Sequence, residues 1–172
     1  MKRIVIIGTS GCGKTTLAKK LGKIINIPYY DMDDYYWLPN WVVRDSEEFP
    51  KIIDAITQNP SWIICGNYSK VNNITWEKAD TIIWLDYNIF RCLYQALKRS
   101  VKNIIYSRPL CGGNYENIRH TFFSKKSIIL WILTTYKKRK ATYTLAFNNQ
   151  IPNKTYLRFN NPNKTRVWLN KI

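Results

Sequence analysis

Eight residues near the N-terminus have types and spacing suited to holding a chain of phosphates. They read Gly8-Thr9-Ser10-Gly11-Cys12-Gly13-Lys14-Thr15 and match GxxxxGK[ST] at every defined position. The glycines let the backbone turn so that its N–H groups point inward at phosphate oxygens. Lys14 would reach the β- and γ-phosphates, the Thr15 hydroxyl would coordinate Mg²⁺, and Thr16 can contact the α-phosphate. The motif predicts a site for ATP and Mg²⁺.

The segments that flank this loop supply the context that the chemistry needs. Lys2–Ile7 is a β-branched run ending at Gly8, which is typical of a buried parallel strand. Lys14–Ile25 carries apolar residues at helical spacing, namely Leu17, Ala18, Leu21, Ile24 and Ile25. The helix dipole would add positive potential at the phosphates. A chance glycine-rich turn would lack this strand–loop–helix setting.

Carboxylates follow two predicted strands. Asp31 and Asp33 end the extended segment Tyr29–Met32 and share one side if the strand continues that far. One could hold Mg²⁺-bound water while the other accepts a proton from the attacking hydroxyl; the alternative is a solvated acidic turn. Asp86 follows the apolar strand Thr81–Leu85 and predicts either a second Mg²⁺ partner or the N-cap of the next helix.

The remaining pattern alternates strands with helices. Further strands are predicted at Trp62–Cys65 and Lys154–Phe159. Helices are predicted after Ser46, at Phe90–Ile105, in one long or broken segment at His120–Phe147, and at Thr165–Ile172, with a loop at Ser107–Asn117. This order favours an α/β fold with a mostly parallel sheet and helices on both faces. We expect one domain over residues 1–172.

Composition narrows the function classes. The 172 residues are 45% apolar, which excludes a disordered chain. The longest apolar run, Ile128–Leu133, is far too short to span a bilayer, so we expect a cytoplasmic protein without a membrane partner. The cysteines at 12, 65, 92 and 111 form no CxxC pair, and His120 is the only histidine. Zinc sites and Ser-His-Asp triads are therefore disfavoured.

The net charge of +16 arises in the second half of the chain. Residues 1–90 hold ten basic and ten acidic side chains, whereas residues 91–172 hold seventeen basic ones and only Glu116 as an acid. Such asymmetry favours an anionic partner, and nucleic acid could bind through Lys125-Lys126 and Lys137-Lys138-Arg139-Lys140. The alternatives are compositional drift and an ordinary solvated helix face.

Longer stretches resemble a known family. The phosphate loop, Tyr30-Asp31-Met32-Asp33, Tyr36-Trp37-Leu38-Pro39-Asn40-Trp41 and Gly66-Asn67-Tyr68-Ser69 are similar to the P-loop DNA topology modulation proteins (the FlaR-like group). These proteins are in turn related to adenylate and shikimate kinases. The resemblance runs from Met1 to about Arg108 and more loosely to the C-terminus. Two positions depart from it: Cys65 stands where many relatives have Asp, and Lys70 where they have Arg.

The resemblance implies a doubly wound sheet of five parallel strands in the order 2-3-1-4-5, with a mobile basic lid at about residues 106–120. It implies that Asp31 lies near Mg²⁺ and that Asp33 faces the phosphoryl acceptor. Gly66, Asn67 and Tyr68 would line the acceptor site. Arg108 would contact the transferring phosphates, with Arg99 as a second choice. The loop with Asn161 and Pro162 would hold the adenine.

Two functions follow from these residues. The first is a Mg²⁺-dependent kinase that transfers the ATP γ-phosphoryl group to a small-molecule or nucleotide acceptor, with Lys14, Asp33 and Arg108 as its catalytic residues. The aromatic residues of 29–41 would stack on a planar acceptor, or they belong to the core. The second is a nucleic-acid-associated ATPase, a kinase that acts on a phosphate end, or a DNA-topology-related binding protein, whose basic residues in 91–172 follow a phosphate backbone. The oligomeric state does not follow from the sequence.

Overall fold

A five-stranded parallel sheet organises the computed structural model, which describes residues 1–118, 121, 124 and 127–172. The strands are β1 (Arg3–Gly8), β2 (Tyr29–Asp31), β5 (Trp62–Cys65), β6 (Thr81–Leu85) and β7 (Thr155–Phe159). They lie side by side in the order β2-β5-β1-β6-β7, with every neighbouring pair parallel. Counted in chain order this is 2-3-1-4-5, so the predicted doubly wound sheet is confirmed.

The central strand β1 sets the position of the phosphate loop. Val5 lies opposite Ile64 of β5 and Ile82 of β6, and all three side chains are fully buried. Gly8 ends β1 opposite Leu85, the last residue of β6. The loop therefore starts at the carboxyl edge of the sheet, where open α/β sheets bind their ligands.

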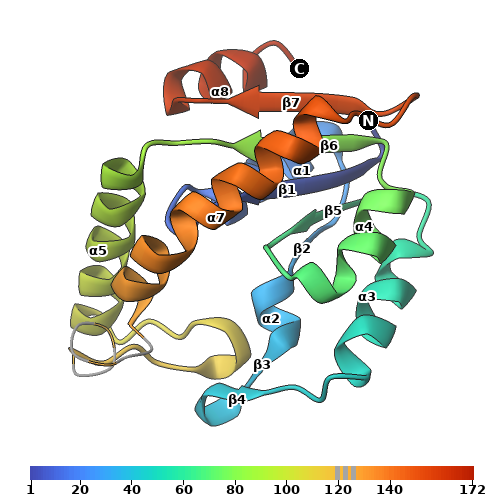
Figure 1. Cartoon of the computed structure of the whole chain (residues 1–172). Coiled ribbons are helices and arrows are strands. Elements are labelled where there is room, and N and C mark those ends of the chain that lie inside the picture. Colours follow the sequence, from blue (N-terminus) through green and yellow to red (C-terminus); the bar gives the residue numbers. More distant parts are fainter. Residues whose placement is uncertain (119–120, 122–123, 125–126) are drawn as a thin grey trace.

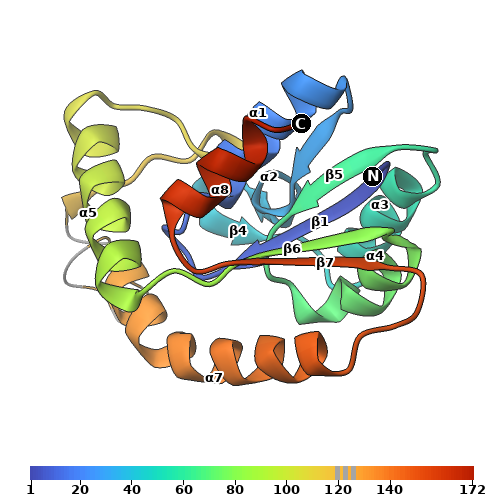
Figure 2. The same cartoon turned by 90° about the horizontal axis from the view of Figure 1, so that it is seen from above.

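Helices cover both faces of the sheet (Figures 1 and 2). On one face α1 (Lys14–Ile25) and α8 (Pro162–Leu169) contribute Leu21 and Leu169 to one buried cluster. On the other face lie α3 (Glu48–Thr57), α4 (Asn72–Lys78) and α7 (Ile128–Asn148), with Ile53 and Phe147 in a second cluster. The helix α5 (Ile89–Ile105) stands at the end of the sheet where β6 finishes (Figure 2).

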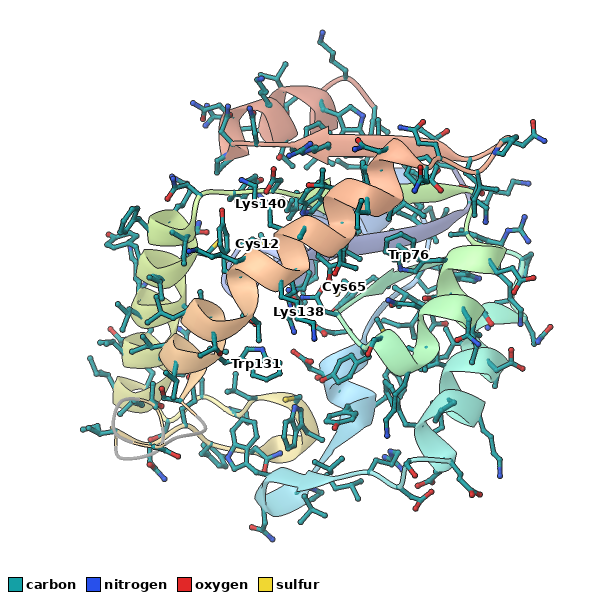
Figure 3. The ribbon with its side chains drawn as sticks, viewed as in Figure 1. Cys12, Cys65, Trp76, Trp131, Lys138 and Lys140 are labelled. Atoms are coloured by element: carbon teal, nitrogen blue, oxygen red, sulfur yellow. The ribbon has the colours of Figure 1, made fainter. Side chains whose placement is uncertain are left out.

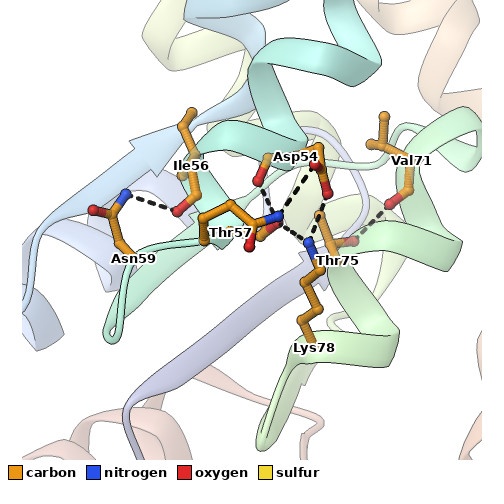
Figure 4. Close-up of polar contacts among 8 residues, drawn as sticks. Asp54, Ile56, Thr57, Asn59, Val71, Thr75 and Lys78 are labelled. Atoms are coloured by element: carbon orange, nitrogen blue, oxygen red, sulfur yellow. Dashed lines mark hydrogen bonds and ion pairs between the residues drawn. The ribbon is translucent and has the colours of Figure 1, made fainter.

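Hydrogen bonds and an ion pair fasten α3 to α4 (Figure 4). The Lys78 ammonium of α4 lies 2.6 Å from the Asp54 carboxylate of α3 and donates to the Thr57 hydroxyl at 3.0 Å. The pKa of Asp54 is lowered, first by its hydrogen bond from Lys78 and then by its bond from Gln58. Surface pairs of this kind contribute little stability alone. These contacts join the end of α4 to α3 on the same face of the sheet.

Several predicted boundaries were correct, and others were wrong. The helix at Lys14–Ile25 and the strands at Trp62–Cys65 and Thr81–Leu85 are confirmed. The last helix begins at Pro162 and not at Thr165, because the Asn161 side chain caps it by accepting from the Lys164 amide. The strand predicted to reach Met32 ends at Asp31, where α2 (Met32–Tyr36) begins.

Some elements had no clear signal in the sequence. A short hairpin of β3 (Trp37–Leu38) and β4 (Val42–Val43) follows α2, and α4 lies between β5 and β6. Of the predicted segment His120–Phe147, the described helix α7 starts at Ile128 with Ser127 as its N-cap. His120 and Lys125-Lys126 lie outside the described residues. Within the described part of the chain, none of the helices combines the length and the apolar character needed to cross a membrane.

Candidate functional site

The phosphate loop packs tightly against the elements behind it. A Cβ atom at Gly8 would lie 2.6 Å from the Leu85 carbonyl oxygen, and one at Gly11 only 2.3 Å from that of Cys92 in α5. Gly11 and Gly13 have φ of 80° and 96°, the left-handed region that glycine tolerates best. A Cβ atom at Gly13 would meet no atom within 4 Å. The loop is thus fixed on one side and open at Gly13.

Lys14 and Thr15 point toward groups that suit their predicted tasks. The Lys14 ammonium donates to the carbonyl oxygens of Gly8 and Thr9, at 3.0 and 3.3 Å. The Thr15 hydroxyl donates to an Asp31 carboxylate oxygen at 2.5 Å. The structure therefore brings the predicted Mg²⁺ residues of α1 and β2 into contact. Ser10 is half-buried, and Thr16 is exposed.

Asp31 also positions Asp33, through a hydrogen bond at the start of α2. Asp31 is the N-cap of α2, and its second carboxylate oxygen accepts from the Asp33 amide at 3.2 Å. The two side chains are therefore neighbours at a strand–helix junction, and not on one side of a continuous strand as predicted. Asp33 in turn accepts a hydrogen bond from the Tyr68 hydroxyl.

The surroundings of Asp33 favour its protonated form. Asp33 retains access to solvent, yet limited solvation by the dense protein around it raises its pKa above the usual carboxyl value, and the Asp31 charge raises it further. The hydrogen bond from Tyr68 and the charges of Lys14 and Arg99 oppose this rise. A carboxylate with a raised pKa beside a phosphate loop is suited to accepting a proton.

Cys65 stands beside these carboxylates at the end of β5. Burial, followed by the Asp31 charge, raises the pKa of the Cys65 thiol, so this position is uncharged at neutral pH. Among the described residues, no group of three or more His, Cys, Asp or Glu side chains is arranged to hold a metal ion. Thr15 and Asp31 nevertheless offer oxygen atoms, the type of ligand that Mg²⁺ prefers.

Asn67 fastens the phosphate loop to its neighbours. Its side-chain amide donates to the Gly8 carbonyl, and its oxygen accepts from the Gly8 amide at 3.3 Å and from the Tyr143 hydroxyl at 3.0 Å. Gly66 packs on Met32, since a Cβ atom there would lie 2.8 Å from the Met32 Cβ. Of the three residues predicted to line the acceptor site, Tyr68 contacts Asp33, and Asn67 is committed to Gly8.

Replacing Asn67 with Ala should loosen this attachment. The Gly8 amide and carbonyl and the Tyr143 hydroxyl would lose partners at a partly buried position, which costs about 1–3 kcal/mol. Urea denaturation should show that loss, and ATP affinity should fall because the loop starts at Gly8. Asn59→Ala is the control for stability alone, because it removes a local bond to the Ile56 carbonyl just after α3 and no bond to the phosphate loop. Unchanged ATP affinity in Asn67→Ala would contradict this role.

Asp86 has other partners than those predicted. The Arg158 guanidinium of β7 donates to one Asp86 oxygen at 2.7 Å, and the Lys140 ammonium lies 3.8 Å from the other. The N-cap of α5 is Asn88, whose side chain accepts from the Phe90 amide, so the capping alternative for Asp86 was wrong. Of the two carboxylates weighed as Mg²⁺ partners, Asp31 is the one that contacts Thr15.

The predicted arginines lie in different surroundings. The positive charge of Arg99, on α5, acts on Asp33. The exposed Arg108 guanidinium lies 5.3 Å from the Tyr106 ring centroid. The sequence indicated Arg139 of α7 only as a possible nucleic-acid contact, but the residue is half-buried, and its charge acts on the Cys12 thiol and the Tyr143 hydroxyl. The signal was the spacing of Tyr136, Arg139 and Tyr143 on one helix face.

The residues of the basic run at the centre of α7, of which Figure 3 labels Lys138 and Lys140, therefore have different surroundings. The Arg139 guanidinium lies 5.2 Å from the Trp131 ring centroid, and its charge acts on Cys12 of the phosphate loop. Lys140 pairs with Asp86, while Lys137 and Lys138 are exposed. The run is not a uniform strip of contacts for nucleic acid. The helix still carries it across the sheet in front of β1 and β6 (Figure 1).

The described part of the predicted lid is attached on two sides. The Asn114 side chain accepts from the Trp41 amide at 2.7 Å and donates to the Leu38 carbonyl at 2.9 Å, which joins the lid to the hairpin. The Glu116 carboxylate accepts from Ser100 at 2.7 Å and from Asn103 at 2.9 Å, which joins it to α5. Neither role was visible in the sequence.

One of the two predicted adenine residues, Asn161, lines a surface hollow. Asn161 caps α8, and Pro162 occupies its first turn. A hollow of about 510 Å³ lies beside them, lined by Asn161, Asn163, Lys164, Val167, Trp168 and Lys171. An aromatic ring and an asparagine amide are groups that can recognise a planar base.

Comparison with known proteins places this site in a wider group. Residues 1–37 match the PduV-EutP family model, described as ethanolamine utilisation - propanediol utilisation. The uncharacterized protein YqaC of Bacillus subtilis (strain 168) is 37% identical over 133 residues, which cover 74% of this chain and 72% of YqaC. The shikimate kinase of Blochmanniella floridana is 27% identical over 135 residues, covering 69% of this chain and 71% of the kinase.

Solved structures show the same architecture. Shikimate kinase from Acinetobacter baumannii in complex with shikimate superposes with a TM-score of 0.65 at 13% identity, covering 99% of this chain and 90% of the kinase. Shikimate kinase from Bacteroides thetaiotaomicron gives 0.58 at 16% identity, with 99% and 95% covered. The chain thus has the fold of these two shikimate kinases, and the extent and identity of the match to YqaC show that it belongs to the family of that Bacillus subtilis protein.

Proposed function

We propose that the protein is a Mg²⁺-dependent phosphotransferase that moves the γ-phosphoryl group of ATP to a small-molecule or nucleotide acceptor. The observation that carries the proposal is the meeting of three groups at the carboxyl edge of the sheet. These are the loop ammonium of Lys14, the Thr15–Asp31 pair and the Asp33–Tyr68 pair. The kinase relatives and the shared fold support this reaction class.

The loop residues would bind and orient the nucleotide. The amides from Gly8 to Thr16 and the start of α1 present N–H groups to the phosphates, and Lys14 turns from the Gly8 carbonyl to the β- and γ-phosphates. Thr15 and Asp31 would hold Mg²⁺, which supplies neutralisation of phosphate charge when bound. Asn161 and Pro162 would border the adenine.

Asp33 would act on the acceptor. In transfer to a hydroxyl acceptor, its oxygen attacks the γ-phosphorus, the bond to the bridging oxygen breaks, and ADP leaves with that electron pair. The acceptor proton moves to the ionised Asp33 carboxylate, which the Tyr68 hydroxyl orients. Arg99 and Arg139 supply positive charge from α5 and α7, and Arg108 of the lid remains a predicted contact to the transferring group.

The test is ADP release from Mg²⁺·ATP with a panel of acceptors. The panel contains shikimate, sugars, nucleosides, nucleoside monophosphates and a single-stranded oligonucleotide with a free 5′ hydroxyl. We expect one acceptor class to raise ADP release well above the basal rate, with a phosphorylated product seen by mass spectrometry. Basal release alone across the panel, from protein that binds ATP, would count against phosphoryl transfer. Stimulation by the oligonucleotide without a phosphorylated product would favour the ATPase alternative.

A further inference from the structure

The helix α5 exposes an apolar stripe on the side that faces away from the sheet. Phe90, Tyr94, Val101 and Ile105 are 76, 63, 43 and 67% exposed. Their spacing of four, seven and four residues puts them on one side of the helix. The buried residues Cys92, Ala96, Ser100 and Asn103 lie on the opposite side. We call the exposed stripe, with its flanking cations Arg91, Lys98 and Lys102, the outer face of α5.

The outer face combines this stripe with positive charge. At 100° per residue, Lys98, Arg91 and Lys102 follow Ile105 around the helix and form a basic row along the stripe. The helix contains no acidic residue. The Lys98 ammonium lies 5.9 Å from the Tyr94 ring centroid, so apolar and basic groups are in direct contact. In both ribbon views α5 stands at the margin of the molecule, with the sheet on its inner side (Figures 1 and 2).

We propose that the outer face of α5 docks on a membrane surface rich in anionic lipid headgroups. A helix with Phe and aliphatic side chains on one side and Lys and Arg beside them lies in the interface between headgroups and acyl chains. Each cation near such a surface contributes attraction to the negative lipids. The sequence had led us to expect no membrane partner, because no apolar run is long enough to span a bilayer. The stripe on α5 is recognisable only once the buried side of the helix is known.

Other occupants fit this face less well. A second copy of the chain would bring two basic rows together, each on a protein with a net charge of +16. Single-stranded nucleic acid binds such surfaces by stacking bases on aromatic rings. Here only Phe90 and Tyr94, at one end of the stripe, offer rings, and Val101 and Ile105 cannot stack. Lipid acyl chains, by contrast, accommodate exposed aliphatic side chains such as Val101 and Ile105.

A protein docked through the outer face of α5 keeps its phosphate loop accessible to solvent. The loop packs on the opposite side of α5, where a Cβ atom at Gly11 would lie 2.3 Å from the Cys92 carbonyl and 3.1 Å from Ala96. Arg99, whose charge acts on Asp33, lies on a different side of α5 from the stripe. The inference therefore does not depend on the proposed reaction, and its test measures binding rather than turnover.

Co-sedimentation with vesicles tests the proposal. The protein should pellet with vesicles of phosphatidylcholine mixed with phosphatidylserine, much less with phosphatidylcholine alone, and binding should weaken as salt rises. Lys98→Gln and Lys102→Gln should each weaken binding about fivefold, the equivalent of about 1 kcal/mol. Phe90→Ser and Ile105→Ser should each weaken it about tenfold, because each removes a large apolar side chain from the interface.

Matched substitutions elsewhere serve as controls. Leu145→Ser changes a side chain of α7 that is 63% exposed, and Lys171→Gln removes a cation near the C-terminus. Both should bind vesicles like the unmodified protein, and circular dichroism melting curves of all variants should coincide. The proposal is overturned if phosphatidylserine does not increase binding or if the controls lose as much as the α5 variants. It is also overturned if the α5 variants lose binding to a single-stranded oligonucleotide while vesicle binding is unchanged.

Discussion

Lys14→Ala should reduce ATP turnover by at least about a hundredfold, the scale seen when one preorganised charged or donor group is removed from a transition state. The ammonium at this position is the one cation of the loop itself, and it lies against the Gly8 and Thr9 carbonyls at the loop's interior. No backbone amide can replace its full positive charge on the β- and γ-phosphates. ATP binding should weaken as well, because the same charge contacts the ground state.

The measurement combines ADP release with calorimetry of Mg²⁺·ATP binding. Lys20→Ala is the matched control, since Lys20 is an exposed lysine of the same helix, six positions further on. It should leave both quantities nearly unchanged. Melting curves should also agree, because the bonds from Lys14 to the loop are made at a partly buried position with solvent nearby. If Lys14→Ala turned over ATP as fast as Lys20→Ala, the phosphate loop would have no part in the reaction.

The sheet and the loop were predictable because their signals are local and strong. β1, β5 and β6 are largely continuous apolar runs, and Lys14–Ile25 repeats apolar residues at helical spacing. The sequence of each segment therefore predicts its secondary structure without reference to the rest of the chain. The end of β2 was not predictable in this way. Asp31 is compatible with a strand by pattern, but its side chain accepts from the Asp33 amide and begins a helix instead.

The site residues also differ in whether a local sequence signal predicted them. Lys14, Thr15 and Asp31 were predicted because a motif or a strand end places them, and the structure brings them together. Asn67 was predicted as a residue of the acceptor site, but its bonds to Gly8 and Tyr143, like the bonds of Asn114 to Leu38 and Trp41, join residues 59 to 76 positions apart. Contacts over such separations have no signature in a single sequence. The resemblance to the topology modulation group likewise remains a prediction, carried by the stretches at residues 36–41 and 66–69.

Asp33→Asn should reduce phosphoryl transfer about 10²- to 10⁴-fold, the usual contribution of a general base, while ATP affinity changes little. The amide keeps the size of the side chain and can still bond the Tyr68 hydroxyl, but it cannot take a proton. Asp34→Asn is the control, because Asp34 is an exposed carboxylate on the next position of α2. Equal losses of transfer and of ATP affinity in Asp33→Asn would argue that the residue shapes the nucleotide site instead.

The pH dependence of transfer separates these roles further. Because the pKa of Asp33 is raised, the ionised base is complete only above that raised value, and kcat/KM should fall as the pH drops through it. Tyr68→Phe removes a hydrogen bond that lowers this pKa, so the acidic limb should move to higher pH. The same linkage gives stability the opposite trend: folded Asp33 takes up its proton before the unfolded chain does, so its contribution to stability rises as the pH falls through the raised pKa. A limb that stays in place in Tyr68→Phe would assign the titration to another group, since Asp33 is the carboxylate that this hydroxyl contacts.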